Sequence, residues 1–418
     1  MKFIHAADLH IDSPMRGLSR YEGAPENELR HASREAFRNL VATALDEQVD
    51  LVILAGDVFD GDWPDFNTGL FFMQQLHNLS SNGIKVVVLA GNHDAESKLT
   101  KQLSYPEGTF KLGHKSAESI LPELLGLEVA VHGQSYANRD VSENLAANYP
   151  APIPGVLNIG VLHTALTGRP DHASYAPCSI DDLRSKGYDY WALGHIHQRE
   201  VVSQNPWIVF PGNLQGRSIR ETGPKGFTLV TTSDGQILDV AHRDADTARW
   251  FNCEVDVTSA NSEQDLLDLI RQRLVEILVE ADGRLAAVRV VVTGQSDLHH
   301  DLMRHRETLV NEVRLLAHPL GEVWIEKVKF TTKGTVDRAE ILGRHEALGD
   351  LFESIDTLRS NPDLLSERFR ETFARLRTKL PREALDDVID PTDQTVLGLA
   401  LDAAESHILE VIGAEPET

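Results

Sequence analysis

The chain has 418 residues, a length that accommodates two or three domains with sizeable hydrophobic cores. Its 64 Asp and Glu residues outnumber its 40 Lys and Arg residues, which gives a net charge of −24. This balance disfavours a protein that binds polyanions over its whole surface, because phosphate contacts need local positive charge.

Strand-like and helical runs alternate in the first part of the chain. Residues 28–47 place apolar side chains on one helical stripe, and residues 50–55 follow as a buried strand. The same order recurs with a helix over 67–78 and a strand over 84–89. This βαβ rhythm predicts a central sheet covered on both faces. Short β-rich segments further along the chain predict a second sheet packed on the first.

A second module is predicted from about residue 250. Apolar residues alternate with polar ones over 251–257, as in a half-buried strand, and Ser262 with Asp265 indicates the start of a helix. The remaining elements are a strand, a helix and a strand, at 285–293, 298–316 and 322–330. The sequence leaves open whether this β-α-β-α-β module covers the site, selects substrate or only packs.

The last part of the chain is helical and charged. Apolar stripes at 348–358, 364–376 and 396–412 must be buried against something. They either fold back on the chain or dock a partner helix, and both interpretations remain open. We therefore predict domains at residues 1–245, 250–332 and 334–418.

Polar residues of metal-ligand type follow five apolar runs, at the points where the expected strands end. Such positions build a site at one edge of a sheet. Two Asp, four His and one Asn are oxygen and nitrogen ligands suited to Mn²⁺, Mg²⁺, Fe²⁺ or Zn²⁺. The five clusters are Asp8-Leu9-His10, Gly56-Asp57-Val58-Phe59-Asp60, Gly91-Asn92-His93-Asp94, His163 and Gly194-His195-Ile196-His197.

The ordered set resembles the motifs of the calcineurin-like metallophosphoesterase superfamily: D-x-H, G-D-x-x-D, G-N-H-D/E, H and G-H-x-H. The resemblance implies a four-layer α-β-β-α sandwich and two divalent ions bridged by Asp57. One ion would be held by Asp8, His10, Asp57 and His197, and the other by Asp57, Asn92, His163 and His195. Two such ions can clamp the attacking and leaving oxygens of a phosphoester displacement.

His93 and Asp94 are the expected catalytic residues. A carboxylate beside His93 favours its protonated form, which suits it to stabilise or protonate the departing alkoxide. The alternative is that His93 only forms hydrogen bonds to ligand residues. Asp60 is expected to orient a ligand histidine from outside the metal shell.

Three features favour a diester substrate, and a nucleic acid in particular. Asp60 is followed by Gly61-Asp62-Trp63 and not by the Arg that protein phosphatases of the superfamily place there. The segments 5–12 and 210–227 resemble those of bacterial SbcD/YhaO-type DNA repair exonucleases. The second segment gathers basic residues, with Arg16 and Arg199 as further candidates, and the expected substrate contacts are Arg217, Arg220 and Lys225.

The resemblance implies a Mn²⁺-dependent DNA nuclease with 3′→5′ exonuclease and single-strand endonuclease action. It also implies an SMC-like ATPase partner and a homodimer near residues 60–78, where Trp63, Phe66, Phe71 and Phe72 serve either the dimer or the core. The alternatives are a small-molecule phosphodiesterase and an inactive scaffold for the ATPase.

Cys178 and Cys253 form no C-x-x-C pair, no apolar run has membrane-spanning length, and the first residues enter a strand. We therefore expect a cytoplasmic protein without a signal peptide.

Overall fold

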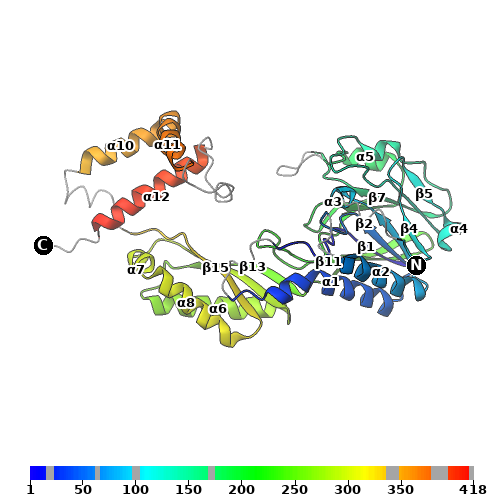
Figure 1. Ribbon diagram of the computed structural model, residues 1–418, viewed down its shortest axis with the longest axis horizontal. Helices are drawn as coiled ribbons and strands as arrows, with labels where there is room; N and C mark the ends of the chain where they lie inside the picture. The colour runs from blue at the N-terminus through cyan, green and yellow to red at the C-terminus, as the bar shows by residue number, and fades with distance from the viewer. Residues whose placement is uncertain are drawn as a thin grey trace. The chain divides into compact units, whose positions relative to one another are not determined.

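The computed structural model describes residues 1–15, 23–61, 66–96, 104–167, 175–335, 348–377 and 394–413 (Figure 1). The chain forms two compact units. The first comprises Met1–Asn252, Val275–Arg289 and Leu320–Lys327, and the second comprises Cys253–Leu274, Val290–Pro319 and Val328–Thr418. The domain boundaries drawn from the sequence stay a prediction.

The first unit contains a six-stranded sheet in the order β12-β11-β1-β2-β3-β4. The four strands β1 to β4 run parallel, whereas β11 and β12 are antiparallel additions at the other side. Because Ala6 of β1 pairs with Leu54 of β2, the carboxyl ends of these strands are level. The strands are β1 (Lys2–Ala6), β2 (Leu51–Ala55), β3 (Lys85–Leu89), β4 (Thr109–Lys111), β11 (Gly226–Ser233) and β12 (Gln236–Asp244).

The same unit contains a second six-stranded sheet, in the order β5-β6-β7-β8-β10-β9. Its central strands β6, β7, β8 and β10 are parallel, and β5 and β9 are antiparallel edge strands. Strand β7 ends at His163 and β8 ends at Gly194, so both strands stop directly at predicted ligand positions. The strands are β5 (Glu118–Ile120), β6 (Val129–Gly133), β7 (Leu157–His163), β8 (Tyr190–Gly194), β9 (Glu200–Gln204) and β10 (Trp207–Phe210).

Three hydrophobic clusters separate four layers and confirm the predicted α-β-β-α sandwich. Alternate residues of β2 face opposite ways: Val52 and Leu54 pack with the helices, whereas Leu51 and Ile53 pack between the two sheets. Helices α1 (Glu26–Asp46) and α2 (Phe66–Ser81) cover the first sheet side by side (Figure 1). The outer face of the second sheet is covered by η3 (Leu145–Asn148) and α5 (Ile180–Ser185). Short helices α3 (Asn92–Glu96) and α4 (Pro122–Leu125) complete the layers.

The predicted β-α-β-α-β order is present in a three-stranded sheet, β13-β14-β15. Ser262 accepts a hydrogen bond from the Asp265 N–H at 3.1 Å, as expected of an N-cap. The single helix predicted over 298–316 was wrong, because two helices meet at His305. The elements are β13 (Ala248–Asp256), α6 (Glu263–Ala281), β14 (Leu285–Thr293), α7 (His299–Arg304), α8 (Arg306–Ala317), η4 (His318–Leu320) and β15 (Val323–Phe330).

Three further helices belong to the second unit: α10 (Gly349–Ser360), α11 (Pro362–Arg377) and α12 (Gln394–Gly413). The α10 residues Phe352 and Ile355 are buried against Leu401 and Ile408 of α12, so this apolar stripe packs within the chain. Arg359 strengthens the contact by pairing with Asp402 at 2.8 Å and with Glu405. Among the described residues, no helix is sufficiently long and apolar to cross a bilayer.

Candidate metal centre

The predicted ligand residues come from both sheets and lie where parallel strands end. Asp8 and His10 follow β1, Asp57 follows β2, and Asn92 begins α3 after β3. From the second sheet come His163, the last residue of β7, and the two histidines after β8, His195 and His197. Face-to-face packing of the two sheets brings these strand ends together, since carboxyl ends of parallel strands share one edge.

The backbone at four of these positions has a left-handed conformation without glycine. The φ angles are +52° at Asp8, +44° at His10, +51° at Asp57 and +95° at His195. This backbone conformation costs about 1–3 kcal/mol of folding free energy at each residue, and it persists where the surrounding structure holds it in place. Here the loops hold each other: Asp8 N–H donates to Gly56 at 3.0 Å and His10 N–H to Asp57 at 3.1 Å. This strain is concentrated at the residues predicted to bind metal.

Three glycines precede ligand residues because the loops approach closely. A Cβ on Gly56 would lie 2.4 Å from His163 Nδ1, and one on Gly91 would lie 2.3 Å from an Asp57 carboxylate oxygen. A Cβ on Gly194 would lie 2.0 Å from the carbonyl oxygen of Ala55. The glycine in each motif therefore provides the space in which the ligand side chains meet.

The side chains gather into overlapping groups whose ligand atoms lie within 4.8 Å of one another. One group contains Asp8, His10 and His197, and another contains Asp57, His163 and His195. Asn92 joins the second, because its Oδ1 lies 2.9 Å from His163 Nε2. A third group contains His10, Asp60 and His93. The first two groups contain residues that the family resemblance assigned to the two ions, and the bridging role of Asp57 stays a prediction.

The protonation pattern of the histidines fits metal ligation. His163 Nδ1 lies 3.0 Å from the Ala55 carbonyl and His197 Nδ1 lies 2.8 Å from Glu221 Oε1, so both Nδ1 atoms are placed to donate. Their Nε2 atoms then face the site. His10 Nε2 and His197 Nε2 lie 3.2 Å apart, and among the described residues the buried His10 Nδ1 has no hydrogen-bond partner. Without metal one of these two Nε2 atoms can donate its proton to the other, and a bound cation would take the place of that proton.

Electrostatics also favours a cation at this site. Burial alone would raise the pKa of Asp57, but the neighbouring His163 ring outweighs burial and lowers it. Burial alone would lower the pKa of His163, and the Asp57 carboxylate offsets this and raises it to about 9. For His10, burial and then the Arg217 charge hold the pKa well below its usual range, leaving a neutral imidazole. Without metal, the protonated His163 therefore balances the charge of Asp57, and a bound cation would take the place of that proton.

The chain matches two family profiles. The calcineurin-like phosphoesterase profile matches residues 1–199, and the profile of the middle domain of metallophosphoesterase YhaO matches residues 250–333. The uncharacterized metallophosphoesterase YhaO of Bacillus subtilis (strain 168) is 34% identical over 364 residues, covering 85% of this chain and 87% of the relative. The chain belongs to the YhaO family of calcineurin-like metallophosphoesterases. The family resemblance drawn from the motifs is confirmed.

Other relatives of this YhaO-family chain carry nuclease or repair names. The DNA double-strand break repair protein Mre11 of Methanopyrus kandleri is 23% identical, covering 82% of this chain and 79% of the relative. One component of the nuclease SbcCD of Escherichia coli (strain K12) is 25% identical, covering 57% of this chain and 67% of the relative. The family assignment establishes a metal-binding metallophosphoesterase.

The carboxylate that pairs with His93 is Asp60, which corrects the expectation from the neighbouring Asp94. His93 Nδ1 lies 2.7 Å from Asp60 Oδ1, and this hydrogen bond raises the pKa of His93. The Asp94 carboxylate instead turns away and accepts the N–H groups of Val58, Phe59 and Gly91 at 2.9–3.1 Å. Asp94 therefore ties two ligand loops together, because residues adjacent in a helical turn point in different directions.

The three predicted substrate-binding cations lie near the centre but in different environments. Arg220 is exposed and lines the same cavity as Asp57, His93 and His197. Arg217 Nη2 donates to Glu221 Oε1 at 3.1 Å, and its Nη1 lies 3.7 Å from Asp60 Oδ2. Lys225 is 4% exposed and donates to the His197 carbonyl at 3.0 Å, so it holds the histidine loop in place. Of the two additional candidates, Arg199 is half-buried and Arg16 lies outside the described residues.

Glu221 is a functional residue that the sequence analysis did not single out. Its carboxylate contacts His197 Nδ1 at 2.8 Å, Asn213 Nδ2 at 3.0 Å and the Arg217 N–H at 2.7 Å. Burial alone would raise the pKa of Glu221, but the His197 ring and the Arg217 guanidinium together outweigh burial and lower it. A carboxylate that orients a ligand histidine is a common feature of metal sites. The one sequence feature that pointed to Glu221 was its position in the segment 210–227, which resembles the nuclease family.

We expect Glu221→Gln to weaken Mn²⁺ binding by about 10- to 100-fold, the usual effect of removing such an orienting carboxylate. The amide oxygen of Gln can satisfy only some of the donors that contact Glu221, its NH₂ group would face the others, and the negative charge beside His197 is lost. Calorimetric titration of Mn²⁺ into the metal-free protein measures the change, with a substitution of the exposed Glu128, Glu128→Gln, as control. Unchanged affinity would contradict the role assigned to Glu221.

Proposed function

We propose that this protein is a metal-dependent DNA nuclease that hydrolyses phosphodiester bonds in DNA repair. The observation that carries the proposal is the convergence of two ligand groups beside a protonatable His93–Asp60 pair. Support for a diester comes from Gly61, which stands where protein phosphatases of the superfamily have an Arg. Support for DNA comes from the names of the Mre11 and SbcCD relatives.

Two divalent ions, most simply Mn²⁺, would supply Lewis acidity and activate water when bound. Asp8, His10, Asp57, Asn92, His163, His195 and His197 would hold them. His93 is 30% exposed and lines the cavity at the centre, so it is placed to donate a proton to the departing 3′-oxygen. Asp60 keeps His93 oriented and is itself fixed by the Ser13 hydroxyl at 2.6 Å.

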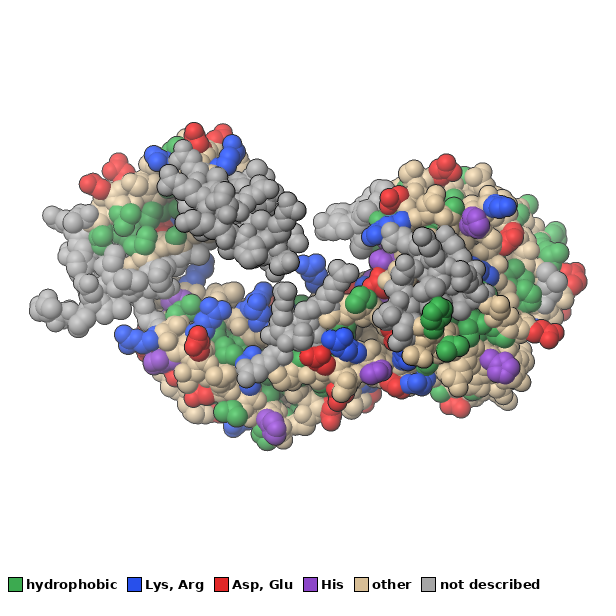
Figure 2. All heavy atoms as spheres, viewed as in Figure 1, with side chains coloured by type: hydrophobic (Ala, Val, Ile, Leu, Met, Phe, Trp, Pro, Cys, Tyr) green, Lys and Arg blue, Asp and Glu red, His purple; other side chains and the backbone are tan. Residues whose placement is uncertain are grey.

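The direction in which DNA is degraded and the partner protein belong to the same proposal. We expect 3′→5′ exonuclease and single-strand endonuclease action, with an SMC-like ATPase that supplies most of the DNA contacts. The visible face in Figure 2 mixes basic and acidic side chains, and the net charge is −24, which supports a role for an additional protein that holds the DNA. The α10 stripe that packs on α12 leaves other parts of the helical region for such a partner.

A homodimer through α2 is part of the proposal. Phe66 and Leu70 are 69% and 66% exposed and lie one helical turn apart. Four aromatic residues were considered for the dimer interface. Two of them, Phe71 and Phe72, are buried in the hydrophobic core and therefore stabilise the fold instead. Trp63 lies outside the described residues.

Arg220 provides the test that separates DNA from a small diester. We expect Arg220→Ala to slow Mn²⁺-dependent cleavage of labelled duplex DNA about tenfold, since one charged hydrogen bond contributes about 1.5–3 kcal/mol. Hydrolysis of bis-p-nitrophenyl phosphate should be unchanged, because that substrate is too short to need the contact. Arg243→Ala is the control.

Equal losses on DNA and on the small diester would favour the alternative, a small-molecule phosphodiesterase acting for instance on cyclic AMP. No turnover of either substrate with Mn²⁺ would favour an inactive scaffold that recruits the ATPase.

A further inference from the structure

Arg217 lies between two carboxylates that orient different parts of the metal centre. Its Nη2 donates a hydrogen bond to Glu221 Oε1 at 3.1 Å, and its Nη1 lies 3.7 Å from Asp60 Oδ2. Glu221 Oε1 in turn lies 2.8 Å from Nδ1 of His197, a predicted metal ligand. Asp60 Oδ1 lies 2.7 Å from Nδ1 of His93, the predicted proton donor. One guanidinium group therefore contacts both of the carboxylates that support the site.

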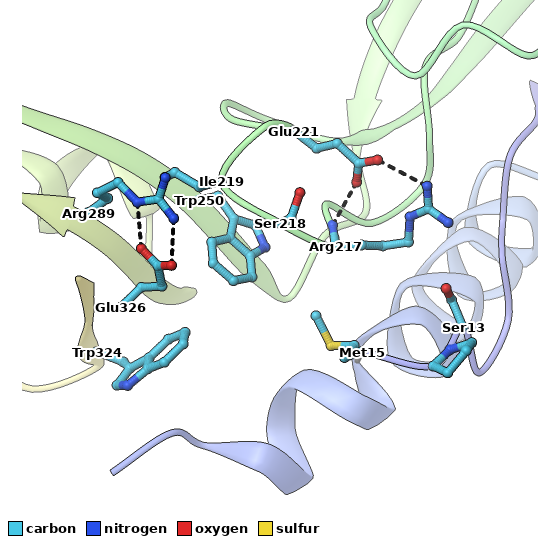
Figure 3. Close-up of a pocket in the computed structure, with 11 residues that line it drawn as sticks. Ser13, Met15, Arg217, Ser218, Ile219, Glu221, Trp250, Arg289, Trp324 and Glu326 are labelled. Atoms are coloured by element: carbon cyan, nitrogen blue, oxygen red, sulfur yellow. Dashed lines mark hydrogen bonds and ion pairs between the residues drawn. The ribbon is translucent and has the colours of Figure 1, made fainter. Parts of the chain in front are cut away.

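The main chain of Arg217 also holds Glu221. The Arg217 N–H donates to Glu221 Oε2 at 2.7 Å, so a single residue binds both oxygens of that carboxylate (Figure 3). The two residues are four positions apart in the loop between β10 and β11. A substitution of the Arg217 side chain therefore removes the guanidinium contacts and leaves the main-chain contact to Glu221 in place.

Asp60 is held from two sides. Ser13 Oγ donates to Asp60 Oδ2 at 2.6 Å, and this is the oxygen that also faces the Arg217 guanidinium. The other oxygen of Asp60 faces His93. The direction of the His93 ring therefore depends on where the Asp60 carboxylate points, and Arg217 attracts that carboxylate toward the loop that carries Glu221.

The three charged side chains are only partly exposed to solvent. Exposure is 25% for Arg217, 22% for Asp60 and 13% for Glu221. Partly buried charges interact more strongly than surface charges, because less water lies between them. Removal of the guanidinium group would leave two negative charges near each other without the cation that now lies between them. Their repulsion would displace Asp60, and His93 would move with it.

These contacts make Arg217 a poor binding group for substrate phosphate. A cation matched by two carboxylates has little net charge left to attract another anion. The cavity that contains Asp57, His93 and His197 is also lined by Arg220, and Arg217 is not among the described residues that line it. Contact with a phosphate at the centre therefore suits Arg220 and not Arg217.

We propose that Arg217 is a positioning residue, which ties the carboxylate that orients His93 to the carboxylate that orients His197. Proton donor and metal ligand then keep a fixed separation. The inference rests on the proposed function, in which His93 protonates the departing oxygen, and it replaces the substrate contact predicted for Arg217 from the sequence. Its consequence is that Arg217 matters most for substrates whose leaving group needs a proton.

The test compares two diesters of equal charge that differ in their leaving group. p-Nitrophenyl methyl phosphate releases a weakly basic phenolate that departs without a proton, whereas phenyl methyl phosphate releases a more basic one that a general acid assists. We expect Arg217→Ala to lower kcat on the phenyl substrate about 10- to 100-fold at saturating Mn²⁺, the usual effect of removing a group that orients another. The loss on the p-nitrophenyl substrate should be clearly smaller, and KM should change little for both substrates.

Two further measurements separate positioning from folding. Arg217→Lys keeps the positive charge but lacks the planar fork that reaches two carboxylates, so it should retain only part of the parent kcat on the phenyl substrate. Guanidinium ions, at concentrations that do not unfold the protein, should raise the kcat of Arg217→Ala on this substrate, a gain that a misfolded protein would not show. Arg243→Ala, at an exposed arginine, is the control and should match the parent on both substrates.

Equal losses on the two substrates, or a loss confined to KM, would overturn the positioning role of Arg217. The variant His93→Gln shows whether the proposed function is at fault. If His93→Gln slows the phenyl substrate selectively and Arg217→Ala does not, the inference fails and the proposed function stands. If His93→Gln slows both substrates equally, the proposed role of His93 as proton donor fails, and the positioning role of Arg217 fails with it.

Discussion

Asp57→Asn is expected to reduce Mn²⁺-dependent phosphodiester hydrolysis by about 10³-fold or more, because a metal centre supplies several kcal/mol of transition-state stabilisation. The substitution keeps the shape of the side chain but removes the charge that would bridge two ions. It also weakens the only carboxylate placed 3.3 Å from His163 Nε2 in the described site. Steady-state rates on bis-p-nitrophenyl phosphate measure the effect.

Asp189→Asn is the matched control for this experiment. Asp189 accepts a backbone N–H from Asn158 at 2.7 Å, but it is exposed and precedes β8, whereas His195 follows the other end of this strand. We expect this variant to lose less than twofold in rate. An Asp57→Asn variant that cleaves as fast as the parent would show that the centre does not depend on a bridging carboxylate.

Gly56→Ala is expected to lower the free energy of unfolding by roughly 2–5 kcal/mol, the combined effect of a left-handed alanine and an overpacked core. Gly56 has φ +99°, and a Cβ there would lie 2.4 Å from His163 Nδ1. The ring must move, which breaks its 3.0 Å contact with the Ala55 carbonyl and displaces its Nε2 from the site. Denaturant unfolding and Mn²⁺ affinity should both report the change.

Gly83→Ala separates the two causes of that loss. Gly83 has a similar φ of +83°, but nothing lies within 4 Å of the position of its Cβ. Its substitution by Ala should lower the free energy of unfolding by about 1 kcal/mol, because only the backbone conformation is unfavourable for Ala. If both variants lose the same stability, the close approach of the ligand loops would not be a constraint on the fold.

Local patterns were sufficient to predict a sheet covered by helices, a second sheet packed on it and polar residues at the strand ends, whereas the four-layer arrangement was predicted from the family resemblance. Each ligand follows a buried strand such as β2, and parallel strand ends must meet at one sheet edge. The alternation of Val52 and Ile53 between two different cores follows from the period of two in a strand. These features depend only on neighbouring residues, so the sequence carries them directly.

Features that depend on side-chain direction or on contacts between distant segments were not predictable in the same way. Adjacency suggested Asp94 as the partner of His93, but a helical turn points Asp94 at the backbone and leaves Asp60 to pair with His93. The basic side chain of Lys225 suggested a contact with substrate phosphate, yet the fold buries it against the loop that carries His197. Trp250 and Trp324 come from two different strands, and no local pattern brings their ring centroids to within 6.0 Å of each other.

The central claim is that this fold holds two divalent ions on a shared aspartate. Calorimetric titration of Mn²⁺ into chelator-treated protein tests it most directly, with metal content after desalting as a second reading of the same quantity. We expect two ions per chain in the parent and a loss of at least one in Asp57→Asn. A parent protein that binds one ion or none would contradict the claim.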